Sequence, residues 1–189
     1  MFKLFVLPLT LCFSTVVFSH PYFYYKMKPC PTFKSQGNIH VDKMMGKWNL
    51  VMLFMDEKSE EYDDDSSCIQ GDFKKINETA FKQMWYINSP HSGYAALVEL
   101  PTAVTHLGDW EIIDPLGGNL TVKVLHASPK SRLTMTFCMI QHGKSVHLWT
   151  AVAMRKTSAS QIELLQVSSE LLAKGFDMND ITMITWNKC

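Results

Sequence analysis

Apolar and polar residues alternate along this chain in short segments, which is the pattern of β-strands that are buried on one face. Clusters of turn-forming residues, such as Asp114–Asn119 and His142–Lys144, separate these segments. The pattern predicts eight strands, with the bounds Lys47–Met55, Ile69–Lys75, Thr79–Asn88, Tyr94–Leu100, Asp109–Ile113, Thr121–His126, Arg132–Ile140 and Val146–Met154. Eight strands with short connections predict an all-β fold, either an up-and-down antiparallel barrel or a sandwich.

The segment Ser160–Lys174 instead predicts a single helix. Its apolar residues recur at helical spacing and are Ile162, Leu164, Leu165, Leu171 and Leu172. Ser158 or Ser160 can cap the start of this helix, and Gly175 suits its end. Because the strand Val146–Met154 is apolar on both faces, we expect the helix to cover the outside of the sheet.

The first 19 residues predict a targeting segment rather than a part of the fold. Lys3 precedes the apolar run Leu4–Phe18, which is too short to span a bilayer. We expect a signal peptide over residues 1–19, cleaved after Ser19 or His20, rather than a retained membrane anchor. Residues 20–189 then form a single secreted, extracellular domain.

The cysteines are consistent with a secreted protein. Cys12 leaves with the signal peptide, and Cys30, Cys68, Cys138 and Cys189 remain. An even number of cysteines in a secreted chain predicts two disulfides, for which three pairings are open. The cysteine spacings do not match those of zinc sites, so no metal is expected.

Composition limits the classes of partner. The 18 basic and 18 acidic residues balance and form no basic cluster, so nucleic-acid binding is not expected. Hydrophobic residues make up 47% of the chain, an excess that an apolar internal cavity would explain. The segment Asp56–Asp65 is strongly acidic and is expected to form an exposed loop. Two sequons predict N-glycosylation at Asn77 and Asn119.

Several short motifs occur in a recognisable order. Gly46-Lys47-Trp48 opens the first predicted strand, Cys68-Ile69-Gln70 opens the second, and Arg155 closes the last. Together with the tail Gly175–Cys189, they resemble the lipocalin family over residues 30–189, in particular its apolipoprotein D-like and insect bilin-binding subgroup. The stretch Ala127-Ser128-Pro129 departs from the family's second motif, so the chain resembles a divergent member.

The resemblance implies an eight-stranded up-and-down antiparallel barrel with one C-terminal α-helix packed outside. Trp48, after Gly46, would plug the closed end, and Arg155 would lie across its indole in a cation–π contact. The implied disulfides are Cys30–Cys138 and Cys68–Cys189. The implied function is that of an extracellular carrier of a small hydrophobic ligand such as a fatty acid, sterol, retinoid or bilin. The implied partners are that ligand, a cell-surface receptor, and a membrane or lipoprotein surface in peripheral contact.

Strand alternation then predicts which side chains line the ligand site. If Trp48 faces inward, the alternate residues of its strand do so as well. Cys138 must face outward to reach Cys30. On the strand of Cys138, the alternate residues Leu133, Met135 and Phe137 then face inward. The predicted ligand-binding residues are Leu50, Met52, Phe54, Ile69, Phe73, Trp85, Leu133, Met135, Phe137, His147 and Trp149.

Other functions make different demands on the sequence. An enzyme is not expected, because all four mature cysteines should pair and no catalytic motif is present. Haem binding would need an inward histidine, for which His126 is the candidate; no cofactor is expected other than bound cargo. A binder of cationic amines would need inward carboxylates, and only Glu99 and Glu111 could supply them. A barrel that acts through its surface, as an inhibitor or interaction module, would have a filled interior and an exposed apolar patch.

Overall fold

The computed structural model describes residues 28–37, 39–55, 68–89, 93–105, 109–113, 119–177 and 181–183. The elements in chain order are α1 (Val41–Met44), β1 (Gly46–Met55), β2 (Cys68–Lys75), β3 (Ala80–Ser89), β4 (Tyr94–Val104), β5 (Trp110–Ile113), β6 (Asn119–Ala127), β7 (Arg132–Gln141), β8 (Lys144–Met154), α2 (Gln161–Leu172) and β9 (Ile181–Met183). The eight predicted strands are all present, and β4 extends further than predicted. The predicted signal peptide, the acidic segment Asp56–Asp65 and Cys189 lie outside the described residues.

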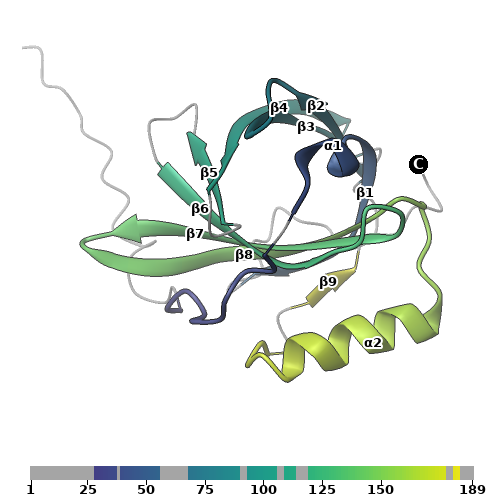
Figure 1. Cartoon of the computed structure of the whole chain (residues 1–189). Helices are drawn as coiled ribbons and strands as arrows, with labels where there is room; N and C mark the ends of the chain where they lie inside the picture. Colours follow the sequence, from purple (N-terminus) through teal and green to yellow (C-terminus); the bar gives the residue numbers. More distant parts are fainter. Residues whose placement is uncertain are drawn as a thin grey trace, which may run out of the picture.

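Strands β1 to β8 form a closed antiparallel barrel, seen as a ring in Figure 1. Neighbouring strands pair in chain order from β2 to β8, then β8 pairs with β1, and β1 pairs with β2 to complete the circle. Closure leaves no free sheet edge around the ring, whereas a sandwich would keep open edges. The predicted barrel is therefore confirmed over the alternative of a sandwich.

Strand β1 changes its partner and its facing partway along its length. Gly46–Asn49 pairs with β2, whereas Met52–Phe54 pairs with β9. Against β8 the register shifts between Leu50 and Met52, so Val51 is the extra residue of a β-bulge. Beyond the bulge the alternation is reversed, and Leu53 joins the cluster inside the barrel.

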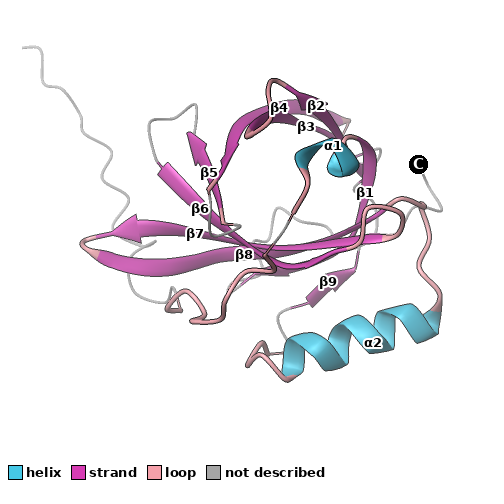
Figure 2. Ribbon diagram, in the orientation of Figure 1, coloured by secondary structure: helices cyan, strands magenta, loops and turns pink. Residues whose placement is uncertain are grey.

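Helix α2 covers the outer surface of β1 and β8, with β9 beside it (Figures 1 and 2). The helix buries Val167 and Leu171 and packs the half-buried Leu164 against the outer cluster of the barrel. The remaining apolar residues of the predicted stripe face outward, and their exposed fractions are 70% for Ile162, 67% for Leu165 and 52% for Leu172. The sequence thus predicted the helix correctly but not which of its faces is packed.

Both ends of α2 are set by local hydrogen bonds. The Glu163 backbone N–H donates to Ser160 Oγ, and the Ser160 N–H donates to the Glu163 carboxylate, which completes a capping box. Hydrogen bonds from Lys156 and Ser160 hold the pKa of Glu163 at about 2. After the helix, Gly175 has a φ of 88°, and the Phe176 N–H donates to the Leu171 carbonyl, as in a Schellman motif.

The helix α1 and an arginine close one end of the barrel. The Trp48 indole N–H donates to the Met44 carbonyl of α1 over 2.8 Å, and both side chains are buried. The Arg155 guanidinium carbon lies 3.8 Å from the centroid of the Trp48 ring, so the predicted cation–π contact is present. Gly46 has a φ of 88°, a conformation that favours glycine, where the chain leaves α1 for β1.

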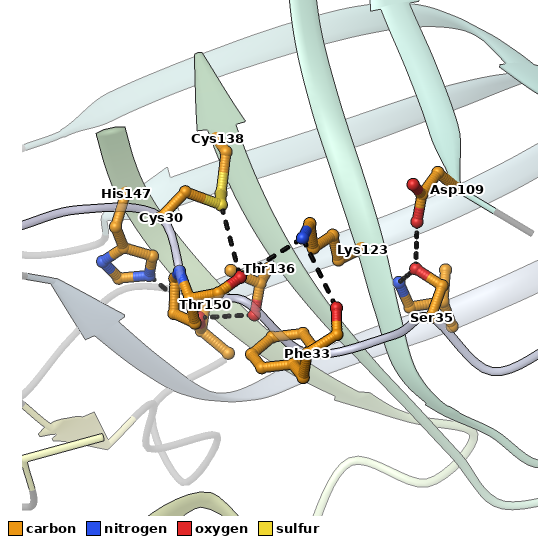
Figure 3. The surroundings of a disulfide bond; sticks show 11 residues. Cys30, Phe33, Ser35, Asp109, Lys123, Thr136, Cys138, His147 and Thr150 are labelled. Carbon is orange, nitrogen blue, oxygen red and sulfur yellow. Dashed lines mark hydrogen bonds between the residues drawn. A yellow bond between two sulfur atoms is a disulfide. The ribbon is translucent and has the colours of Figure 1, made fainter. Parts of the chain in front are cut away.

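The segment before α1 crosses the outside of β6, β7 and β8 and is tied to them by the Cys30–Cys138 disulfide (Figure 3). The Cys30 N–H donates to the Ser145 carbonyl over 3.0 Å, and the Lys123 ammonium donates to the carbonyls of this segment. This is one of the two predicted disulfides. Cys68 is also disulfide-bonded, and its predicted partner Cys189 lies outside the described residues. No helix in the described ranges is long and apolar enough to cross a membrane.

Candidate ligand-binding site

If the end of the barrel that α1 closes is taken as its lower end, the upper half is the half at the opposite, open end. This upper half contains a cavity of about 330 Å³. Its walls come from β1, β2, β3, β4, β7 and β8. The lining residues are Leu50, Leu53, Met55, Ile69, Trp85, Ile87, Val98, Leu100, Phe137, Trp149 and Ala151. All of them are apolar, and no ionisable side chain is among the described residues that line the cavity.

The lower half of the barrel is filled by aromatic side chains. The ring centroid of Phe73 lies 5.3 Å from that of Phe81 and 6.3 Å from that of Trp48. Phe81 in turn meets Trp110 edge to face at 5.0 Å, and all four side chains are buried. The cavity therefore ends above this aromatic layer and does not run the length of the barrel.

Three polar side chains inside the barrel hydrogen-bond to one another at the depth where the cavity ends. The Trp85 indole N–H donates to Gln83 Oε1 over 3.1 Å, and Gln83 Nε2 donates to the Thr102 hydroxyl over 2.9 Å. Thr102 Oγ1 donates to the Leu100 carbonyl over 3.0 Å. Burial of these groups is stabilising only because they are paired, and their pairing fixes the orientation of the Trp85 indole.

A glycine beside Trp85 makes room for its ring. Gly71 of β2 pairs with Trp85 of β3, and the indole lies over the glycine. A Cβ atom at Gly71 would lie 2.8 Å from the nearest ring carbon, closer than such contacts normally come. Trp85 also meets Phe73 edge to face, with the two ring centroids 5.6 Å apart.

The predicted ligand-binding residues separate into three groups in the structure. Five of them line the cavity, namely Leu50, Ile69, Trp85, Phe137 and Trp149. Three others, Phe73, Leu133 and Met135, are buried in the interior cluster but do not line the cavity. The remaining three, Met52, Phe54 and His147, lie outside the barrel, so the prediction that they face the interior is wrong.

The reason for these three errors is the same. The bulge at Val51 turns Met52 and Phe54 onto the outer face, where they pack in the cluster that includes Val167 of α2. A second register shift, between β7 and β8, leaves Leu148 without a partner on β7. Simple alternation cannot be continued through a bulge, because each extra residue exchanges the two faces of the strand.

His147 therefore belongs to the surroundings of the disulfide and not to the cavity (Figure 3). Its Nε2 lies 2.9 Å from the Thr150 hydroxyl, which lies 2.9 Å from the Thr136 hydroxyl. The His147 ring also meets Phe176 edge to face at 5.8 Å. These contacts place it between the barrel wall and the segment that follows α2.

The cavity contains residues that the predicted ligand set omitted. Leu53 and Met55 line it because of the bulge in β1, which no simple pattern in the sequence reveals. Val98 and Leu100 come from β4, where they alternate with Leu97 and Glu99. That alternation is visible in the sequence and would have identified both residues if the strand had been assigned a face.

The ionisable residues considered for other functions lie outside the barrel. His126 lies beside Arg132 and Glu170, next to α2. Its pKa is lowered mainly by burial and to a smaller extent by the positive charge of Arg132. Glu99 is exposed and pairs with Lys82 at 2.9 Å, and Glu111 is also exposed. The described lining of the cavity thus holds neither the histidine that haem binding would need nor the carboxylates that amine binding would need. No cluster of three or more metal-binding side chains occurs among the described residues.

Both predicted glycosylation sites are exposed. Asn77 lies in the turn between β2 and β3, where its side-chain oxygen accepts a hydrogen bond from the Thr79 N–H over 2.9 Å. Asn119 is the first residue of β6.

Comparison with protein-family models and with curated protein sequences gave no match. Among solved structures, the chain is similar to the siderocalin Ex-FABP, a protein described as functioning through dual ligand specificities. The TM-score is 0.61 with 15% sequence identity, over 75% of this chain and 93% of that one. At this identity the likeness establishes the fold, which is the lipocalin fold: an eight-stranded barrel with a helix packed outside.

Proposed function

We propose that this protein is a carrier that holds a small hydrophobic ligand in the upper half of its barrel, and that it is not an enzyme. The observation that supports this most strongly is the cavity of about 330 Å³, whose described lining residues are all apolar. Each Å² of apolar ligand surface that leaves water contributes about 25 cal/mol to binding. Because the barrel is closed and its lower half is packed, little ordering of the protein has to accompany binding.

The chemistry of the lining restricts the ligand. A charged group placed among Leu50, Leu100 and Phe137 would lose its hydration without gaining a partner, which is strongly unfavourable. A carboxylate or another polar head therefore stays at the open end, and the apolar body enters. Fatty acids, sterols, retinoids and bilins are the ligand classes suggested by the resemblance to lipocalins. No resident cofactor is part of the proposal.

The alternative of a barrel that acts only through its surface is supported less well. It requires large side chains to fill the interior, whereas a cavity stays open above the packed layer of Trp48, Phe73 and Phe81. The amine-binding alternative needs inward carboxylates, and Glu99 and Glu111 are both exposed. A receptor or a lipid surface remains a proposed partner of the carrier.

We further propose that the carrier is secreted and belongs to the apolipoprotein D-like subgroup. The Cys30–Cys138 disulfide supports an oxidising compartment, since such bonds are rare in the cytosol. The apolar run Leu4–Phe18 supports a signal peptide, and the exposure of Asn77 and Asn119 supports their glycosylation. We also propose that Cys68 and Cys189 form the second disulfide.

A displacement titration with delipidated protein tests the carrier function. The fluorescent probe N-phenyl-1-naphthylamine should bind saturably and be displaced by laurate. Leu100→Trp places a large ring in the cavity and should weaken probe binding by about tenfold or more. Leu97→Trp is the matched control, because Leu97 is on the same strand but is exposed on the outer face. Absence of saturable binding, or equal binding by both variants, would contradict the proposal.

A further inference from the structure

We propose that the cavity selects ligands with one unbranched apolar chain that enters end-on, and that Trp85 sets the length of chain that is accepted. The inference rests on the proposed carrier function and adds to it the ligand class and a specificity-determining residue. It follows from three properties of the described residues: the size of the cavity, the pairing of the polar groups beneath it, and the immobilisation of the Trp85 indole.

The cavity is small for a multi-ring ligand. Small-molecule sites typically measure ~300–1,000 Å³, and the cavity of about 330 Å³ is at the lower end of this range. Extension downward is blocked by the packed rings of Phe73, Phe81 and Trp110. A narrow chain can use this volume fully, whereas a linear tetrapyrrole or a haem would have to displace lining side chains or remain largely outside the mouth.

The polar groups beneath the cavity are already paired. Gln83 uses its carbonyl for Trp85 and its amide nitrogen for Thr102, whose hydroxyl donates to a backbone carbonyl. A ligand that buries its own N–H or C=O groups would therefore find no partner among the described residues that line the cavity, and each such group costs binding energy. Bilins have polar groups along their whole length, whereas a fatty acid has only one polar end. Because Gln83, Trp85 and Thr102 already hydrogen-bond to one another, the cavity favours a ligand whose single head group stays at the mouth.

Trp85 is fixed on three sides. Its ring lies over Gly71, its N–H is held by Gln83, and it meets Phe73 edge to face. Its remaining side faces the cavity, where the indole forms part of the lining. A chain that grows inward therefore meets a ring that cannot move away without breaking the bond to Gln83 or clashing with β2.

This arrangement predicts that affinity rises with chain length up to a certain length and then levels off. The chain length at which the rise ends is the break. For saturated fatty acids from octanoate to stearate, each added methylene that enters the cavity should tighten binding roughly fourfold. Once the chain reaches Trp85, further methylenes remain at the mouth and affinity stops rising. Biliverdin and haemin should not displace a bound fatty acid.

Two substitutions should move the break in opposite directions. Trp85→Leu removes the ring and deepens the cavity, so the break should shift to longer chains. Gly71→Ala pushes the indole toward the cavity, so the break should shift to shorter chains. In the double variant there is no indole for the added methyl group to displace, so the break should match that of Trp85→Leu alone.

Phe54→Leu is the matched control, because Phe54 is as buried as the interior aromatics but packs outside the barrel. It should reduce stability without moving the break. Displacement of N-phenyl-1-naphthylamine measures all variants, and circular dichroism verifies that each has folded. A break that stays in place in Trp85→Leu, or tight binding of biliverdin in competition with laurate, would overturn the inference while leaving the carrier function standing. Failure of both the probe and every fatty acid to bind the folded wild-type protein would instead overturn the carrier function itself.

Discussion

The Arg155 guanidinium lies over the Trp48 indole, with its central carbon 3.8 Å from the ring centroid. The same guanidinium donates to three carbonyls from separate segments, those of Pro129, Lys47 and Lys43. One side chain therefore joins the β6–β7 turn, α1 and the start of β1 to the last barrel strand. Trp48, which this guanidinium covers, packs against Phe73 in the aromatic layer beneath the cavity.

Arg155→Lys should destabilise the barrel although the charge is kept. A lysine cannot donate in three directions from one plane or stack on the indole as a guanidinium does. We expect a loss of about 2 kcal/mol in the free energy of unfolding, measured by urea titration. Lys130→Arg, in the same region but on an exposed residue, is the control and should be neutral. A lysine variant as stable as the wild type would contradict the structural role of the arginine.

Removal of the Cys30–Cys138 disulfide should lower the stability of the protein without changing its affinity for the ligand. The bond closes a sequence separation of 108 residues and lies on the outer face of β7. For the double variant Cys30→Ala and Cys138→Ala we expect a loss of about 2–5 kcal/mol in unfolding free energy. The affinity for laurate, measured below the unfolding transition, should stay unchanged. A large loss of affinity in the folded variant would show that the N-terminal segment takes part in the site.

Because of the bulge in β1, substitutions at two adjacent residues should affect different properties of the protein, namely stability and ligand affinity. Met52→Ala should reduce stability by about 2–5 kcal/mol, because Met52 is buried between the barrel and α2, and should leave ligand affinity unchanged. Leu53→Ala should weaken laurate binding, because Leu53 lines the cavity. Titration calorimetry together with urea unfolding separates the two effects. The reverse assignment, with Met52 controlling affinity, would be the outcome of uninterrupted alternation and would refute the bulge.

This pair of residues also illustrates how far the sequence alone can predict the structure. Alternation identified every barrel strand, because that pattern depends on burial of one face and survives small errors in register. Closure of the ring depends on the pairing of β1 with β8, which lie far apart in the chain. The choice of a barrel over a sandwich came from the resemblance carried by Gly46, Trp48 and Arg155.

The side-chain facing could be predicted only up to the first bulge. Val51 and Leu148 leave no recognisable mark in the sequence, yet each one exchanges the faces of its strand, so the errors at Met52, Phe54 and His147 follow directly. The packed face of α2 was ambiguous for another reason. Leucines occupy both sides of this helix, and only the tertiary contacts decide that Leu171 is buried while Leu172 is exposed.

His126 predicts a pH dependence of stability. Burial, and secondarily the charge of Arg132, lower the pKa of His126 below its ordinary value of 6.5, with Glu170 acting in the opposite direction. The unfolded chain therefore takes up the proton at a higher pH than the folded protein does. We expect the free energy of unfolding to fall as pH drops below about 6.5, and the loss to be complete below the folded-state pKa of His126.

The effect of His126 can be isolated by substitution. His126→Gln should reduce the loss of stability between neutral and mildly acidic pH, measured as the shift in urea midpoint. His126 lies beside α2 and outside the cavity, so ligand affinity at neutral pH should not change. An unchanged pH dependence in the variant would assign the titration to another group.

Nuclear magnetic resonance can locate a bound ligand in the barrel directly. Delipidated protein with labelled methyl groups is titrated with laurate. We predict saturable shifts at Leu50, Leu53, Leu100 and Ala151, which line the cavity, and none at Met52 or Val167, which lie between the barrel and α2. Shifts confined to the outer residues, or no shifts at all at saturating laurate, would contradict the claim that the upper half of this barrel is a ligand site.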